Sequence, residues 1–255
     1  MTKAILVVSF GTTYPETRKK TIEACEERIR QEFPDYEIYR AFTSGVVRRR
    51  IRINEGIEIP DVSQALMEIR DQGIREVYIQ PLHVILGSEY EKVLKQSEAF
   101  QSSFEVLKIG LPLLASIEDY ESLKEILLAK YNHFGQGVAT VLMGHGSEHH
   151  NFAAYSALDH MLLDSSVFIG CVESYPPVEQ IEVRLRQKGI SKVHLAPLML
   201  VAGDHATNDM SADEEGSWYR YFSEKGYQVE THLEGLGENE NVQDLYIEHL
   251  NRIVR

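Results

Sequence analysis

Four side chains of the sequence could together bind a divalent metal ion. His145 and Glu173 each come directly after an apolar run, and His205 lies in a polar stretch after a third such run. Glu89 has a comparable place in the first half of the chain. Imidazole and carboxylate groups bind first-row divalent ions such as Co²⁺, Fe²⁺, Ni²⁺ and Zn²⁺ without help from a thiolate. The four residues therefore predict a site of mixed nitrogen and oxygen ligands.

Each of these residues also has a structural explanation. The imidazole of His145 could cap a helix or pack in a core, and the carboxylate of Glu173 could accept hydrogen bonds from its own loop. The glycines that flank His145 favour function, because they leave the ring room and let backbone approach a ligand. The position after a strand favours it too, because ligands of open parallel sheets bind beyond the carboxyl ends of the strands.

Other histidines are weaker candidates. His149 and His150 follow His145 closely, but the segment does not match the HExxH pattern of zinc hydrolases, and we expect both in the first turn of a helix. His83 is predicted to pack or to support the site indirectly. GxGxxG, P-loop and GxSxG patterns are missing from the sequence, so neither nucleotide binding nor acyl transfer is indicated.

One cationic cluster stands out in an acidic chain, whose formal net charge is −13. It consists of Arg48, Arg49, Arg50 and Arg52. A solvated helix face explains such a cluster, and so does binding of a polycarboxylate substrate, because guanidinium groups pair with carboxylates in a bidentate manner. We keep both interpretations. The overall negative charge argues against nucleic-acid binding.

Composition indicates a soluble globular protein of 255 residues with 43% hydrophobic and 25% charged residues. No apolar run reaches the length of a membrane span. Residues 4–10 resemble a first strand rather than a secretion signal, and the two cysteines, Cys25 and Cys171, give no disulfide framework or CxxC site. We therefore expect a cytoplasmic protein.

Short β-branched runs alternate with helical patterns, which predicts an α/β fold with mostly parallel sheets flanked by helices. A first helix is expected to begin at Thr13, with Glu16 completing a capping box. A later helix is expected from the spacing of Tyr120, Leu123, Leu127 and Tyr131. The predicted strands are residues 4–10, 37–42, 76–81, 104–108, 139–143, 167–172, 192–197 and 228–232.

An internal repeat indicates two lobes. Residues 73–87 align without gaps with residues 189–203, and Glu89 then aligns with His205. A weaker match places Phe10 opposite His145. The long match has an offset of 189 − 73 = 116 residues, and the weaker match has an offset of 146 − 11 = 135 residues. The first half therefore holds 135 − 116 = 19 additional residues between its two matching segments.

Residues 44–60 could supply most of the additional residues of the first half and form an extra helix. Chance similarity between generic strand-turn-helix units is the alternative to a true repeat. We predict an N-terminal lobe at residues 1–116, with the arginine-rich helix, and a C-terminal lobe at residues 117–255 that carries His145, Glu173 and His205.

The chain resembles the class II tetrapyrrole chelatases, and among them the anaerobic sirohydrochlorin cobaltochelatase (CbiK) family. The resemblance covers nearly the whole chain in order. It rests on the segments 6–12 (LVVSFGT), 40–45 (RAFTSG), 89–92 (EYEK), 143–146 (MGHG), 172–176 (VESYP) and 197–205 (PLMLVAGDH).

The resemblance implies two chelatase-like lobes with a tetrapyrrole cleft between them, and insertion of Co²⁺ into sirohydrochlorin during cobalamin biosynthesis. The family's metal ligands fall on His145, Glu173 and His205, and its active-site acid falls on Glu89. His145 is the candidate base for the two pyrrolic protons, because neutral imidazole can both ligate a metal and accept a proton.

The partners expected are sirohydrochlorin and a divalent metal, with no nucleic acid and no membrane, and no permanently bound cofactor is expected. Co²⁺ would be the substrate metal, with Fe²⁺ and Ni²⁺ as alternatives. An Fe²⁺-inserting chelatase for sirohaem and a non-catalytic bilobal carrier of metal or tetrapyrrole are the alternative functions. The sequence leaves the oligomeric state open, a homo-oligomer included.

Overall fold

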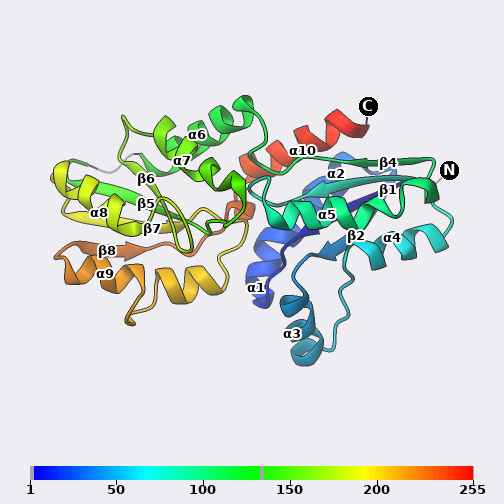
Figure 1. The fold of residues 1–255 in the computed structure, drawn as a ribbon, viewed down its shortest axis with the longest axis horizontal. Coiled ribbons are helices and arrows are strands. Elements are labelled where there is room, and N and C mark those ends of the chain that lie inside the picture. Colours follow the sequence, from blue (N-terminus) through cyan, green and yellow to red (C-terminus); the bar gives the residue numbers. More distant parts are fainter. Residues whose placement is uncertain (1–2, 133–134, 255) are drawn as a thin grey trace. The chain divides into compact units, whose positions relative to one another are not determined.

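The computed structural model describes residues 3–132 and 135–254, which form two compact α/β units (Figure 1). The first unit comprises Met1–Ala115 and Gly237–Arg255, and the second comprises Ser116–Leu236. Each unit holds a four-stranded parallel sheet, with strand order β2-β1-β3-β4 in the first and β6-β5-β7-β8 in the second. The predicted fold of two lobes, each with a parallel sheet flanked by helices, is confirmed.

The predicted strands all form, with ends within two residues of those expected. The first unit contains β1 (Lys3–Ser9), α1 (Pro15–Arg18), α2 (Ala24–Glu32), β2 (Tyr36–Phe42), α3 (Gly45–Glu55), α4 (Val62–Asp71), β3 (Glu76–Pro81), α5 (Ser88–Glu98), β4 (Val106–Ile109) and α10 (Glu240–Val254). The second contains α6 (Ile117–Tyr131), β5 (Val138–Gly144), α7 (Ala153–Met161), β6 (Val167–Cys171), α8 (Val178–Gln187), β7 (Lys192–Pro197), α9 (Trp218–Glu224) and β8 (Gln228–Thr231).

The strand register preserves the internal repeat. Ala4 of β1 pairs with Val77 of β3, and Ala139 of β5 pairs with Val193 of β7. The differences, 139 − 4 = 135 and 193 − 77 = 116, are the two offsets of the sequence repeat. Because strand order and register both agree, the repeat is structural and does not reflect chance similarity of generic units.

The additional residues of the first half form α3, the extra helix expected there. Ser44 caps its N-terminus by accepting a hydrogen bond from the backbone N–H of Val47. Arg18, which is buried, makes a bidentate ion pair with Glu55 at the other end of α3. The first helix differs from the prediction, because it begins after Tyr14 with Pro15 in its first turn, and no Thr13–Glu16 capping box forms.

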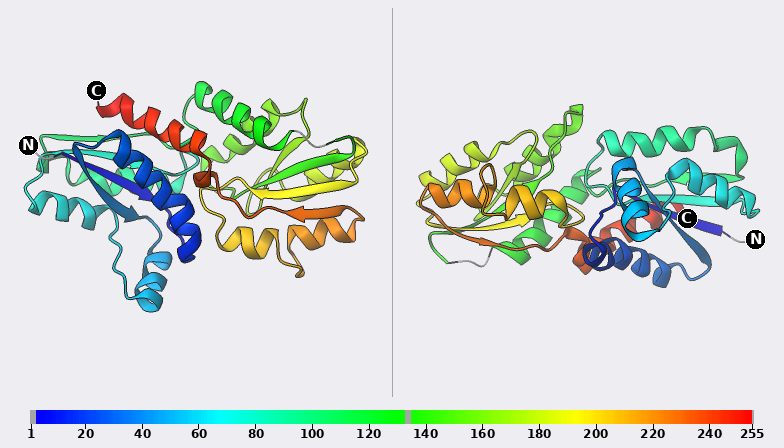
Figure 2. Two further views of the ribbon diagram at one scale, coloured as in Figure 1. Left: turned by 180° about the vertical axis from the view of Figure 1, so that it is seen from behind. Right: turned by 90° about the horizontal axis from the view of Figure 1, so that it is seen from below.

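Alternating strand residues build a core on each face of each sheet. In the first unit, α4 and α5 cover one face, and α2 and α10 lie on the other (Figure 2). In the second unit, α8 and α9 pack against Val193 and Leu195 of β7, while α6 and α7 cover the opposite face. Within residues 3–132 and 135–254, no helix has the length and hydropathy of a membrane span.

The C-terminal helix departs from the expected lobe of residues 117–255. Helix α10 packs on β3 and α2 of the first unit, where Tyr246 is fully buried and donates a hydrogen bond to the carbonyl of Leu82 at 3.0 Å. The amide of Gln243 donates to the carbonyl of Gly237 at 2.8 Å. The chain therefore returns to its first sheet after completing the second one.

Candidate metal centre

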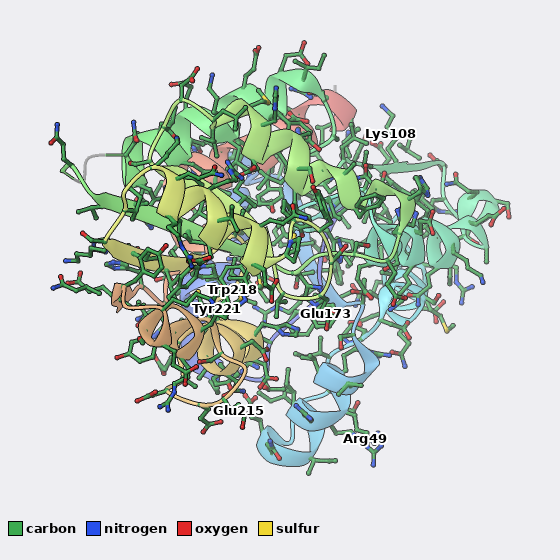
Figure 3. The ribbon with its side chains drawn as sticks, turned by 60° about the vertical axis from the view of Figure 1, so that its left-hand side comes forward. Arg49, Lys108, Glu173, Glu215, Trp218 and Tyr221 are labelled. Carbon is green, nitrogen blue, oxygen red and sulfur yellow. The ribbon has the colours of Figure 1, made fainter. Side chains whose placement is uncertain are left out.

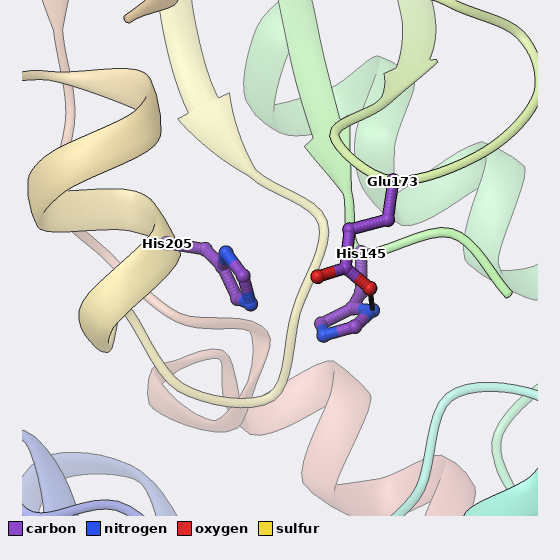
Figure 4. A group of neighbouring side chains, drawn as sticks. All are labelled: His145, Glu173 and His205. Atoms are coloured by element: carbon purple, nitrogen blue, oxygen red, sulfur yellow. Dashed lines mark ion pairs between the residues drawn. The ribbon is translucent and has the colours of Figure 1, made fainter.

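Three loops at the carboxyl ends of neighbouring strands bring the predicted ligands of the second unit together (Figure 4). His145 directly follows β5, Glu173 lies in the loop after β6, and His205 precedes a π-helical turn at Ala206–Met210. The backbone N–H of Glu173 donates to the carbonyl of His145 at 3.0 Å, which ties the first two loops together. The site thus rests on main-chain contacts between strand ends.

The side chains are close enough to share one ion. The ring centroids of His145 and His205 are 4.6 Å apart, and Nδ1 of His145 lies 3.5 Å from Oε2 of Glu173. One ligand atom from each residue lies within 4.8 Å of the other two. The side chains are 42%, 56% and 31% exposed for His145, Glu173 and His205. An ion bound here would therefore keep a side open to a second ligand, as metal transfer requires.

Hydrogen bonds orient both imidazoles. Nδ1 of His205 lies 2.7 Å from Oδ2 of Asp209, and Nδ1 of His145 lies 3.2 Å from the carbonyl of Gly146. Because carboxylates and carbonyls only accept, each Nδ1 donates in these contacts, and in the neutral tautomer of that kind the lone pair lies on Nε2. Asp209 received no role from the sequence, although its spacing of four residues from His205 on a helix was a usable signal.

The glycines around His145 are sterically required. A Cβ on Gly144 would lie 2.7 Å from the ring of Tyr155, and a Cβ on Gly146 would lie 2.8 Å from Cβ of Ser174. Gly146 also has a φ of +89°. The packing of Tyr155 of α7 against β5 therefore depends on Gly144, and the close approach of the β5 and β6 loops depends on Gly146.

Neither cysteine belongs to the ligand group. Cys171 ends β6 and is buried, and burial raises the pKa of its thiol to about 12. Burial likewise raises the pKa of Cys25, in the first unit, to about 12. Because metals bind the thiolate, both thiols stay protonated and do not compete with the imidazoles.

Glu89 lies in the first unit and outside this group of three. It occupies the first turn of α5, and Lys92 pairs with its Oε1 while its Oε2 is buried without a hydrogen-bond partner among the described residues. His83 interacts electrostatically with Glu89, and burial lowers the pKa of His83 to about 4. The ring of His83 approaches the hydroxyl of Thr43 at 3.4 Å. The carboxyl edge of the first sheet therefore holds a neutral imidazole beside a carboxylate.

The remaining candidates make other contacts. His149 caps the short turn His150–Phe152 that leads into α7. In the arginine cluster, Arg48 and Arg52 pair with Asp61 and Glu58. Arg49 and Arg50 are exposed, and Figure 3 shows Arg49 extending outward from α3.

Comparison with known proteins assigns the family. The family model described as cobalt chelatase (CbiK) matches residues 3–255. The chain belongs to the cobalt chelatase (CbiK) family. This CbiK-family chain is 44% identical over 254 residues to the sirohydrochlorin cobaltochelatase of Salmonella typhimurium, covering 99% of this chain and 96% of that protein. It is 32% identical to the sirohydrochlorin cobaltochelatase CbiKC of Nitratidesulfovibrio vulgaris, covering 99% and 90%.

Solved structures show the same fold at low identity. The structure of SirB from Bacillus subtilis with Fe³⁺ matches with a TM-score of 0.64 and 12% identity, over 99% of this chain and 96% of that one. The structure of CbiX, described as the terminal enzyme for sirohaem biosynthesis in denitrifying bacteria, matches with a TM-score of 0.57 and 16% identity, over 98% and 99%. Both likenesses extend across the two units of the CbiK-family fold.

Proposed function

We propose that this protein is a sirohydrochlorin cobaltochelatase, which inserts Co²⁺ into sirohydrochlorin in cobalamin biosynthesis. The observation that carries the proposal is the convergence of His145, Glu173 and His205 within 4.8 Å in a member of the cobalt chelatase family. The names of two relatives, at 44% and 32% identity over nearly the whole chain, support the same substrate pair.

The three ligands suit a metal that must be released. Two imidazole nitrogens and one carboxylate oxygen hold Co²⁺ without thiolate, and the exposed side leaves coordination positions for the nitrogens of the macrocycle. Each new bond to a ring nitrogen can then replace one bond to the protein. We propose His145, Glu173 and His205 as the metal-binding residues.

Insertion of a divalent ion releases two pyrrolic protons, so the site needs a base. His145 is proposed for this role, because its Nε2 becomes free to accept a proton as Co²⁺ leaves it. Glu89 is the second proposed catalytic residue. Its buried Oε2 has no donor among the residues that the structure describes, and it can therefore accept the other proton.

The assay follows the absorption spectrum of sirohydrochlorin after addition of limiting Co²⁺. We expect His145→Ala and His205→Ala to lower the protein-dependent insertion rate by about 100-fold or more. His160→Ala is the control, because His160 is an exposed histidine of α7 outside the ligand group. Wild-type rates in both active-site variants would refute the site, and a wild-type rate equal to the protein-free rate would indicate a carrier.

Arg49 and Arg50 are proposed to meet peripheral carboxylates of the substrate. Both are exposed on α3, which begins just after the carboxyl end of β2. Replacing both with alanine should raise KM for sirohydrochlorin several-fold with little change in kcat, because the lost contacts are the same in ground and transition states. Arg75→Ala is the control, since Arg75 is exposed at the opposite, amino end of β3. An unchanged KM would contradict the role.

A further inference from the structure

We propose a second divalent-metal site in the second unit, formed by His194, Glu230 and His232. One ligand atom from each of these residues lies within 4.8 Å of the other two, the same criterion that His145, Glu173 and His205 satisfy. Nδ1 of His194 lies 2.8 Å from Nε2 of His232 and 3.4 Å from Oε2 of Glu230. The inference concerns ion binding alone and does not depend on the proposed function.

The sheet itself places the three side chains together. His194 lies in β7 and pairs in register with Glu230 of β8, and His232 follows Glu230 by two residues, so it points to the same face. Val193 and Leu195, the neighbours of His194, face the core under α8 and α9. His194 therefore faces the opposite side of the sheet, together with Glu230 and His232.

The internal repeat shows that the fold does not require this cluster. In the first unit, the pair that corresponds to His194 of β7 and Glu230 of β8 is Tyr78 of β3 and Lys108 of β4. Gly110 corresponds to His232, because the N–H of Gly110 donates to the carbonyl of Ile79 just as the N–H of His232 donates to the carbonyl of Leu195. The first unit thus carries tyrosine, lysine and glycine at the three positions, and these side chains offer no comparable set of metal ligands.

The geometry suits a borderline ion such as Co²⁺, Ni²⁺ or Zn²⁺. The facing ring nitrogens share one hydrogen, and an ion that replaced it would hold them about 3.3 Å apart at its usual bond length. The two nitrogens, now 2.8 Å apart, would need to move apart only slightly. His232 directly follows the edge strand β8 and is only partly buried, so it can make this movement. Glu230, whose side chain is 53% exposed, gives the ion a path from solvent.

Lys192 opposes cation binding to some extent. Its ammonium lies 2.6 Å from Oε1 of Glu230, whereas Oε2 faces His194. The two carboxylate oxygens of Glu230 therefore have different partners, and Oε2 can bind the proposed ion while Oε1 stays paired with Lys192. We expect Lys192→Gln to tighten metal binding at this site, because it removes a positive charge beside the carboxylate.

The test is Co²⁺ binding to the full chain without sirohydrochlorin, measured by equilibrium dialysis. We expect two equivalents on the wild type, and one on a variant with both His145→Ala and His205→Ala. His232→Gln should bind one equivalent, and Glu230→Gln should weaken the second equivalent by at least about tenfold. These two positions are partly or largely exposed, so neither variant depends on changing the buried His194.

A thermal measurement gives a second readout. In the variant without His145 and His205, Co²⁺ at about 100 times its Kd should raise the unfolding midpoint by about 5–10 °C, because the ion ties β8 to β7. His160→Ala in the same background should keep the shift, and His232→Gln should abolish it. One equivalent on the wild type, no binding after loss of His145 and His205, or two equivalents on His232→Gln would each overturn the proposal.

Discussion

At the scale of single residues, the affinity of the proposed centre for a metal should also depend on groups that are not ligands. Asp209 accepts the Nδ1 proton of His205 and so directs Nε2 toward the position of the ion. The same carboxylate makes the imidazole a stronger donor. Near Nδ1 of His145 lie a neutral carbonyl, that of Gly146, and the more distant carboxylate of Glu173. The two imidazoles should therefore differ as ligands, with His205 the better fixed.

Asp209→Asn is expected to weaken Co²⁺ binding at the centre of His145, Glu173 and His205 by about 10–100-fold, because an amide orients the imidazole less firmly than a carboxylate. Binding should be measured by dialysis on a His232→Gln background, which isolates this centre. Asp204→Asn is the matched control, since Asp204 contacts the amide of Asn208 in the same loop. Equal affinity in both variants would contradict the orienting role.

Burial of His83 makes stability depend on pH. Its pKa in the folded protein, about 4, lies below the ordinary histidine value of 6.5. Between these values the unfolded chain binds more protons, so the free energy of unfolding falls as pH decreases from about 6.5 to about 4, by about 3 kcal/mol in total.

His83→Met places at this position the residue found at its repeat counterpart, Met199. Denaturant unfolding of the variant at pH 6.5, 5.5 and 4.5 should show a shallower loss of stability than the wild type. The comparison of slopes removes the contribution of carboxylates common to both proteins. Parallel slopes would show that His83 titrates normally in the folded state.

At the scale of elements, the metal centre depends on how closely the β5 and β6 loops approach each other. Gly146 allows this approach, because its missing Cβ leaves room for Ser174 and its φ of +89° is costly for other residues. Two further backbone contacts, from Val172 to Gly144 and from Glu173 to His145, join the same loops. The positions of His145 and Glu173 are thus set by one shared backbone geometry.

Gly146→Ala should therefore lower both stability and Co²⁺ affinity. Gly189→Ala is the matched control, because Gly189 has a φ of +66° with open space around its Cβ position. The control should cost about 1 kcal/mol for backbone conformation alone, measured by denaturant unfolding. The Gly146 variant should cost more and lose metal affinity as well. Similar behaviour of the two variants would show that the contact with Ser174 is unimportant.

At the scale of the whole molecule, the last segment of the chain belongs to the first unit. Helix α10 covers the first sheet through the buried residues Val242, Tyr246 and Leu250. The first unit therefore needs residues from both ends of the chain, whereas the second is continuous. Loss of α10 should affect the two units unequally.

Tyr246→Ala is expected to destabilise the first unit by about 3–5 kcal/mol, because it opens a cavity and removes the hydrogen bond to Leu82. Hydrogen exchange should then be faster in β1 and β3, with protection of β5 and β7 little changed. Phe222→Ala, at a fully buried position of α9, should produce the reverse pattern. Equal loss of protection in both sheets would mean that the units unfold together.

The sequence by itself predicted the strands and the three residues proposed as ligands of the main centre. Apolar runs of β-branched residues mark the strands, and the repeat offsets of 116 and 135 reappear as strand register. His145, Glu173 and His205 were predictable because parallel strands end at one edge of a sheet, so residues after neighbouring strands meet there. Glu89 was predicted as the repeat counterpart of His205 and from the family resemblance, and its catalytic role stays a prediction.

Only the tertiary structure decided which sheet α10 covers, which group orients His205, and that His194 meets Glu230 and His232. The apolar stripe of α10 predicts a buried helix face but fits either sheet, because burial of apolar surface is not directional. The first helix start was mispredicted for a similar reason, since Thr13 and Pro15 offer competing signals that only the surrounding backbone resolves. The second histidine cluster joins two strands whose pairing register no local pattern specifies.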